Sequence, residues 1–238
     1  MIDIIRLDKY LSNSGVGSRK DIKSLVKKGL VTVDGRTVSD PGIRVDENTS
    51  DIRVENNPIA YKKYIYLMMN KPAGYVSATF DKHFPTVLDL LDEYCLSFKP
   101  FPAGRLDIDT EGFVLLTNDG DLSHRILSPK KHVKKTYMVV SDIPADASDI
   151  TVFKDGVVLD DGYKTMSAQL APDKDNTSYL TLQEGKFHQV KRMFEAVGKH
   201  VTYLKRISIG NLPLDESLAP GEYRELTEEE IKQLCEEI

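Results

Sequence analysis

The sequence GRLDIDTEG at residues 104–112, followed by the apolar sequence FVLLTNDG at residues 113–120, organises the chain. The first stretch is polar and lies between two glycines, which is typical of a loop, whereas the second is typical of a buried strand. A strand holds the loop that leads into it, so carboxylates there are either turn formers or reactive groups at the floor of a pocket. The candidates in this loop are Asp107, Asp109 and Glu111.

The composition is that of a globular protein with one large domain or two unequal ones: 238 residues, 40% apolar and 29% charged. No apolar run approaches the ~20 residues that span a bilayer, and the first residues do not resemble a signal peptide. We therefore expect no membrane association and a cytoplasmic location. The two cysteines, Cys95 and Cys235, lie far apart, and the five histidines lack metal-binding spacing, so we expect no metal site.

The net charge of −5 hides an uneven distribution along the chain. Residues 215–238 carry nine acids against two bases, a net of −7, which leaves +2 for residues 1–214. Residues 1–37 carry eight bases against four acids, a net of +4. Because local charge governs binding to a polyanion more than total charge does, the N-terminal part is a candidate nucleic-acid-binding region.

The N-terminal residues predict two helices and a hairpin. A helix over 7–13 ends before two glycines, and a second helix starts after Ser18, with Asp21 completing a capping box. A strand over 30–33 then leads into an Asp-Gly hairpin turn. Basic residues share one arc of the second helix, and this arc is either a solvated face or a phosphate-binding one. They are Arg19, Lys20, Lys23 and Lys27.

From residue 64 onward the pattern predicts an α+β domain, with many strands, short turns and interspersed helices forming a largely antiparallel sheet. We expect strands over 64–69, 113–117, 136–140, 201–209 and 223–226, and short strands within 150–183. We expect helices over 86–94, 122–127, 186–197 and after residue 227, and a turn over 70–74. Phosphate-binding glycine loops of the GxxxxGK[ST] and GxGxxG types are absent, so we expect no nucleotide cofactor.

The N-terminal motifs RLDKYL at 6–11, GVGSRK at 15–20 and KGLVTVDG at 28–35 resemble the alpha-L RNA-binding motif, the module named after ribosomal protein S-four. The resemblance implies a small RNA-binding domain over residues 1–57, a linker over 58–63 and a second domain over 64–238. It also implies that Arg6 and the basic helix contact RNA phosphates without reading bases.

Four motifs in the second domain together resemble the pseudouridine synthases of the RsuA family. They are NKPAG at 70–74, GRLD at 104–107 with LLTNDG at 115–120, KKTY at 134–137, and EGKFHQVKRM at 184–193. Each is weak alone, but they occur in the family's order behind an RNA-binding module. The resemblance implies a mixed, mostly antiparallel central sheet flanked by helices, and an isomerase that needs no cofactor.

The family's functional residues match positions of this chain. Asp107 corresponds to the essential aspartate, Tyr137 to the tyrosine against the target base, and Lys191 to the basic residue near the aspartate. Arg105 corresponds to the arginine associated with base flipping, and Asp109 and Glu111 have no such role. Next to the reaction loop, a lysine cluster is expected to contact phosphates. Its members are Lys130, Lys131, Lys134 and Lys135.

We expect a monomer acting on a single uridine of small-subunit rRNA within an assembly intermediate, because the short acidic C-terminal helix resembles the small-subunit enzymes. The alternatives are the same reaction on large-subunit rRNA, a non-catalytic RNA-binding assembly factor, and a glycosidase-like hydrolase using Asp107 and Asp109 as a carboxylate pair.

Overall fold

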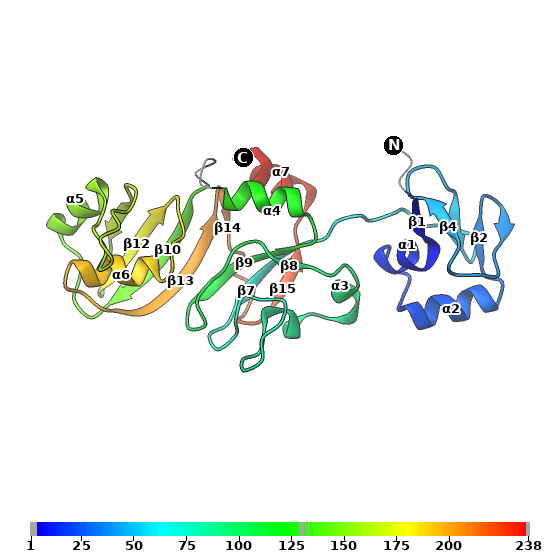
Figure 1. The fold of residues 1–238 in the computed structure, drawn as a ribbon, viewed down its shortest axis with the longest axis horizontal. Coiled ribbons are helices and arrows are strands. Elements are labelled where there is room, and N and C mark those ends of the chain that lie inside the picture. Colours follow the sequence, from blue (N-terminus) through cyan, green and yellow to red (C-terminus); the bar gives the residue numbers. More distant parts are fainter. Residues whose placement is uncertain (1–3, 129–130, 132, 237–238) are drawn as a thin grey trace. The chain divides into compact units, whose positions relative to one another are not determined.

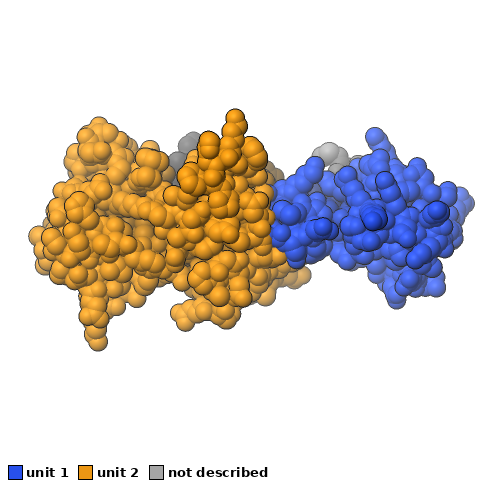
Figure 2. All heavy atoms as spheres, turned by 90° about the horizontal axis from the view of Figure 1, so that it is seen from below, with its two compact units in different colours: residues 1–65, 91–100 blue, residues 66–90, 101–238 orange. Residues whose placement is uncertain are grey.

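The structure, a computed structural model, describes residues 4–128, 131 and 133–236 (Figure 1). The chain divides into two compact units, one of Met1–Ile65 with Leu91–Pro100 and the other of Tyr66–Leu90 with Phe101–Ile238 (Figure 2). No helix among the described residues is long and apolar enough to cross a membrane. The domain limits drawn from the sequence stay a prediction.

Unit 1 contains three short helices and small sheets around one apolar core. The core takes buried side chains from α1, α2 and the strands, for example Leu11, Ile22 and Ile52. The helices are α1 (Leu7–Asn13), α2 (Arg19–Lys27) and α3 (Glu93–Ser97). The strands are β1 (Ile4–Arg6), β2 (Val31–Val33), β3 (Arg36–Thr37), β4 (Arg44–Asp46), β5 (Ile52–Val54) and β6 (Asn57–Pro58), with β1 pairing β4 and the others in the order β3-β2-β5-β6.

The predicted capping box and hairpin are confirmed. The Ser18 hydroxyl accepts from the Asp21 N–H at 3.3 Å, and the Asp21 carboxylate accepts from the Ser18 N–H at 3.0 Å. Such a cap stabilises a helix by about 1 kcal/mol. Asp34 and Gly35 both have positive φ, 50° and 74°, as a two-residue turn between β2 and β3 requires.

Unit 2 is built on a nine-stranded sheet, and the predicted mixed, mostly antiparallel architecture is confirmed. The strand order is β11-β12-β10-β13-β9-β7-β15, with β14 added to β13 and β8 added to β9, and only the β13–β9 pairing is parallel. The strands are β7 (Tyr66–Lys71), β8 (Phe101–Pro102), β9 (Glu111–Thr117), β10 (Lys135–Ser141), β11 (Gln169–Pro172), β12 (Thr177–Leu182), β13 (Val201–Ile209), β14 (Leu212–Pro213) and β15 (Tyr223–Glu225).

Helices flank this sheet. Apolar residues of α4 (Gly120–Leu127) and α7 (Glu228–Glu236) share a core with β7 and β9, and these two helices lie together in Figure 1. α5 (Ala147–Asp155) and α6 (Gln189–Ala196) lie beside the part of the sheet formed by β10, β12 and β13. The sheet thus brings segments that are far apart in sequence, including the loop before β9, onto one framework.

Three predicted elements were wrong. The helix expected over 86–94 is a 3-10 helix, Val87–Leu90, followed by the separate α3. The Asp89 carboxylate accepts from the Thr86 N–H at 2.6 Å, and the Asp92 carboxylate accepts from the Cys95 N–H at 2.7 Å. Asp89 thus caps the start of the 3-10 helix and Asp92 caps the start of α3, so the segment forms two separately capped turns in place of one helix.

Short strands were expected from residue 150 onward, but residues 150–155 belong to the helix α5. Its β-branched residues favour strands, but Asp146 and Asp149 form a capping box and Phe153 is fully buried, which together stabilise a helix. The expected turn over 70–74 starts later than predicted, because Asn70 and Lys71 still pair with β9 as part of β7.

Candidate active site

A buried lysine fixes the loop that carries the three carboxylates. Lys71, at the end of β7, is fully buried, and its Nζ donates to the carbonyl oxygens of Pro72 at 3.0 Å, Ile108 at 3.2 Å and Thr110 at 2.7 Å. Burial lowers the pKa of Lys71 to about 8. The lysine therefore holds the loop through the loop's backbone carbonyls and leaves the side-chain carboxylates free to contact other groups.

The segment that follows β7 holds the loop at two further points. Ser77 exchanges two hydrogen bonds with the backbone of Leu106, donating to its carbonyl at 3.2 Å and accepting from its N–H at 3.1 Å. The Gly74 N–H donates to the carbonyl of Ile108 at 2.7 Å. The structure thus joins the first sequence motif to the second, which the order of motifs along the chain did not reveal.

The end of the loop is fixed by a close approach of two strands. Gly112 has φ +99° and lies opposite Arg206 in the parallel β9–β13 pair, where an added Cβ would collide with the Arg206 backbone. The Arg206 side chain is buried, and its Nε donates to the Phe113 carbonyl at 2.7 Å. Only glycine fits at this point, so the position of the loop is determined at both ends.

Asp107 lies between two groups of the segment at α6. Its Oδ2 is 3.5 Å from Lys191 Nζ, and its Oδ1 is 3.7 Å from His188 Nε2. The Asp107 side chain is 26% exposed, so it is open to a substrate yet shielded from bulk water on most sides. The helix expected to start at residue 186 starts at Gln189, because His188 adopts a left-handed conformation with φ 47° and ψ 32°.

The predicted pairing of Asp107 with Lys191 is only part of the arrangement. Lys191 Nζ donates to Asp109 at 2.6 Å, closer than its distance to Asp107. Partial burial opposes ionisation of Asp109, but the hydrogen bond and charge of Lys191 outweigh it and lower the pKa of Asp109. Asp109 therefore holds the cation in place rather than forming a second reactive carboxylate.

Glu111 has a separate role on the sheet. It accepts a hydrogen bond from the Tyr203 hydroxyl at 2.7 Å. Burial, together with this bond, raises the pKa of Tyr203 to about 12. The three carboxylates of the loop therefore differ in their contacts. Glu111 binds a tyrosine, Asp109 binds Lys191, and Asp107 faces both Lys191 and His188.

Neither Tyr137 nor Arg105 forms a hydrogen bond or ion pair with the carboxylates of the loop or with Lys191. Tyr137 is buried on β10, in register with Arg206 of β13, which is itself in register with Gly112. The sheet therefore aligns Tyr137 with the end of the loop, two strands away. Arg105 is exposed, and no described residue lies within ion-pair distance of it.

The predicted RNA-contacting residues fall into different environments. Arg6 binds the buried Asp8 carboxylate through two hydrogen bonds, at 3.1 and 2.7 Å, while its side chain remains 60% exposed. Lys135 is half-buried, and burial lowers its pKa to about 8. Lys130 lies outside the described residues. The remaining predicted cations are exposed: Arg19, Lys20, Lys23, Lys27, Lys131 and Lys134.

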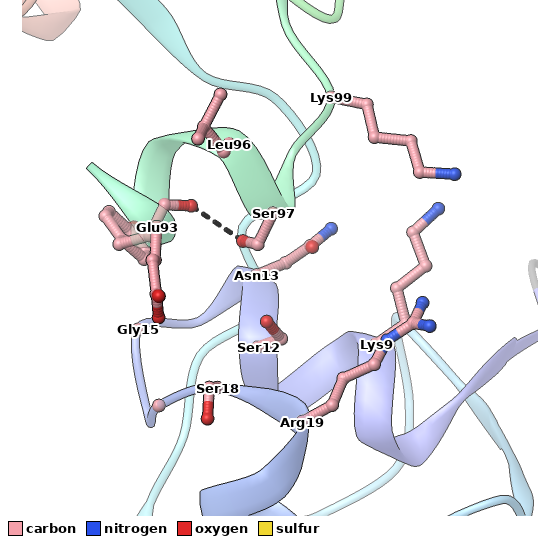
Figure 3. A pocket seen from close by; sticks show the side chains of 12 residues that line it. Lys9, Ser12, Asn13, Gly15, Ser18, Arg19, Glu93, Leu96, Ser97 and Lys99 are labelled. Carbon is pink, nitrogen blue, oxygen red and sulfur yellow. Dashed lines mark hydrogen bonds between the residues drawn. The ribbon is translucent and has the colours of Figure 1, made fainter. Parts of the chain in front are cut away.

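One of these cations, Arg19, lines a cavity of about 510 Å³ in unit 1 (Figure 3). Lys9 of α1, Arg19 of α2 and Lys99 after α3 line the same opening, whose floor includes the buried Ser12 and Asn13. Three cations around one hollow can hold phosphate oxygens of a polyanion. Lys9 and Lys99 were missed from the sequence, because only folding brings residues 91–100 to the first helix.

Comparison with known proteins agrees with this arrangement. Residues 65–196 match the family of RNA pseudouridylate synthases, and residues 5–50 match the S4 domain. The chain is 54% identical to the "uncharacterized RNA pseudouridine synthase YtzG" of Bacillus subtilis, covering 98% of this chain and 99% of that protein. It is 44% identical to ribosomal small subunit pseudouridine synthase A of Escherichia coli, covering 95% and 98%.

A solved structure gives the same result. A crystal structure of a pseudouridylate synthase superposes with a TM-score of 0.68 at 38% identity, covering 97% of this chain and 99% of that one. Sequence identity over nearly the full length, the two matched domains and the shared fold all lead to one assignment. The chain belongs to the RsuA family of RNA pseudouridine synthases, isomerases that here carry an S4 domain ahead of the synthase domain.

Proposed function

We propose that this enzyme converts one uridine of small-subunit rRNA to pseudouridine, with Asp107 as the catalytic carboxylate. The observation that carries the proposal is the placement of Asp107 on a loop fixed by Lys71, with Lys191 and His188 facing its two oxygens. The names of the relatives in Escherichia coli and Yersinia pestis, both ribosomal small subunit pseudouridine synthase A, support small-subunit rRNA as the substrate.

The reaction needs no oxidant and no activated phosphate. The bond from C1′ to N1 breaks, the uracil turns, C5 bonds to C1′, the C5 proton leaves and N1 gains a proton. Asp107 can attack the ribose as a nucleophile or accept a ribose proton, and in either role it must be ionised. Lys191 Nζ lies 3.5 Å from Asp107 Oδ2 and places a positive charge beside this carboxylate.

The target base must leave its stack before the carboxylate can reach it. Unstacking costs a few kcal/mol, which contacts to the flipped nucleotide offset. We assign Arg105, exposed beside Asp107, to the gap left in the RNA, and Tyr137, at the floor of the sheet, to the flipped base. The exposed cations of unit 1 and Lys131 and Lys134 then hold the RNA backbone.

We place the reaction in the cytoplasm, on an assembly intermediate in which the uridine is still accessible, with the enzyme acting as a monomer. Mapping pseudouridines in both rRNAs of a deletion strain tests the substrate. One missing pseudouridine in small-subunit rRNA is expected, and a missing one only in large-subunit rRNA would overturn that part of the proposal.

Asp107→Asn tests the carboxylate, with release of tritium from [5-³H]uridine in rRNA as the measure of turnover. We expect no detectable release with Asp107→Asn and near-normal binding of the RNA. Asp109→Asn is the matched control, because its carboxylate is on the same loop but is 65% exposed. Full activity of Asp107→Asn would refute its role, and an inactive wild-type protein that still binds rRNA would favour a non-catalytic assembly factor.

A further inference from the structure

Two stacked aromatic side chains lie next to the candidate reaction centre. Phe187 and His188 follow β12 and precede α6, and their ring centroids are 3.8 Å apart with an interplanar angle of 18°. Phe187 is 76% exposed, the largest exposed fraction among the large apolar side chains in the described part of the chain. One face of this ring contacts His188, and most of its remaining surface is in water.

The exposed ring does not result from a loose loop. The Gln189 side chain accepts from the Lys186 N–H at 2.8 Å and donates to Glu184 at 2.8 Å. Glu184 also accepts from the Tyr163 hydroxyl at 2.8 Å and from the Met166 N–H at 2.7 Å. Glu184 and Gln189 are both buried, so this network fixes both ends of the short segment that carries Phe187.

The backbone at this point is also unusual. His188 has φ 47°, a left-handed conformation that residues other than glycine adopt uncommonly, although histidine, asparagine and aspartate adopt it more often than the rest. Such conformations persist where the surrounding structure over-determines them, and they cluster at functional sites. Here the left-handed residue presents its ring to Asp107, with Nε2 3.7 Å from Oδ1. The stacked pair thus begins at the carboxylate and extends outward to Phe187.

We propose that Phe187, supported by His188, is a stacking surface for an unpaired base of the substrate RNA adjacent to the target uridine. The inference rests on the proposed role of Asp107 as the reaction centre. The pair begins 3.7 Å from the Asp107 carboxylate, so a nucleotide next to one bound at Asp107 lies within reach of it. Bases stack on aromatic side chains in this way wherever single-stranded RNA is bound.

Phe187 acts as a positioning residue in this account. The stacked neighbour holds the strand open and keeps the flipped uridine in place, while Tyr137 is assigned to the flipped base itself. Every base has an aromatic face, so the surface accepts any base at that position. Lys186, which is exposed just before the pair, supplies positive charge for an adjoining phosphate.

The test uses [5-³H]uridine-labelled total RNA from a strain lacking the gene, which contains the unmodified substrate whichever rRNA it is. Phe187→Ala is expected to lower kcat/KM for tritium release about tenfold, the size of one base–aromatic stack. Phe187→Trp is expected to restore it. Ile143→Ala is the matched control, since its side chain is 50% exposed and follows the far end of β10.

A second measurement identifies the base. On an oligonucleotide that spans the mapped uridine, an abasic nucleotide at one neighbouring position should remove the difference between wild type and Phe187→Ala. Wild-type activity of Phe187→Ala, failure of Phe187→Trp to restore it, or an undiminished difference on both abasic substrates would each overturn the inference. If Phe187→Ala is fully active while Asp107→Asn is inactive, only the stacking surface is refuted, whereas an active Asp107→Asn refutes the proposed function.

Discussion

Two lysines are buried in the described part of unit 2, and their hydrogen-bond partners differ in kind. Lys71 donates to three carbonyl oxygens around the carboxylate loop, at 2.7 to 3.2 Å. Lys199 donates to the buried carboxylate of Asp149 at 2.6 Å and so joins the end of α6 to α5. A lysine bound to carbonyls leaves nearby carboxylates free to contact other groups, whereas a lysine bound to a carboxylate occupies it in an ion pair. The first arrangement suits a reaction loop, and the second suits a structural contact.

Of the two lysines, Lys71 is expected to have the larger effect on turnover when it is replaced, in Lys71→Met. The substitution keeps the volume but removes the Nζ donor from the Pro72, Ile108 and Thr110 carbonyls, of which only that of Ile108 still accepts from the Gly74 N–H, and this costs about 1–3 kcal/mol of stability. It also frees the loop that carries Asp107, and small misplacement of a reacting group lowers the rate about a hundredfold. Tritium release and urea unfolding measure the two effects. A variant that is destabilised but fully active would show that Lys71 is only structural.

Lys199→Met should lower stability by about 3–5 kcal/mol, because it leaves Asp149 buried without its partner. The kcat of the folded fraction should not change, since neither residue contacts the loop. Lys232→Met is the control, because its ion pair with Glu229 is exposed and contributes little. A loss of kcat at a temperature where Lys199→Met is fully folded would remove the contrast between the two lysines.

The stability that Lys71 contributes should depend on pH, and this effect is of intermediate size. Its pKa is about 8 in the folded protein and 10.5 in an ordinary lysine, so between these values the unfolded chain binds the extra proton. Stability from this group therefore rises with pH across that window and is constant below it. The difference in unfolding free energy between wild type and Lys71→Met should change in favour of wild type from pH 8 to pH 10. A constant difference would contradict the lowered pKa.

The smallest effect is expected from Asp109→Asn. Its bond to Lys191 is short, but the carboxylate is 65% exposed and screened by water. We expect kcat/KM to fall by no more than about fivefold, since Lys191 remains beside Asp107. A loss as large as that of Asp107→Asn would assign the two carboxylates equal roles and would revive a paired-carboxylate mechanism.

Much of the fold and the site could be predicted from local patterns. The helix caps at Ser18 and Thr227, the hairpin at residues 34–35 and the main strands follow from capping, turn chemistry and periodicity. The order of the motifs along the chain was enough to identify Asp107 and Lys191 as candidate site residues. The structure places the Lys191 Nζ 3.5 Å from the Asp107 Oδ2. The helix α5 was missed although Asp146 and Asp149 signal its start, because its β-branched residues favour a strand.

The sequence by itself determined the family, the mixed sheet and the identity of the loop, because these depend on short-range patterns and on motif order. Only the tertiary structure showed which side chains hold the loop at residues 104–112 and which stabilise the sheet and helices around it. Lys71 reads as a turn residue, yet sheet pairing buries it beneath residues 108–110. Phe187 reads as part of a helix, yet the left-handed His188 and the Glu184–Gln189 network hold it in solvent. Pairing between strands that are distant in sequence, together with burial, determines these positions, so local sequence patterns could not predict them.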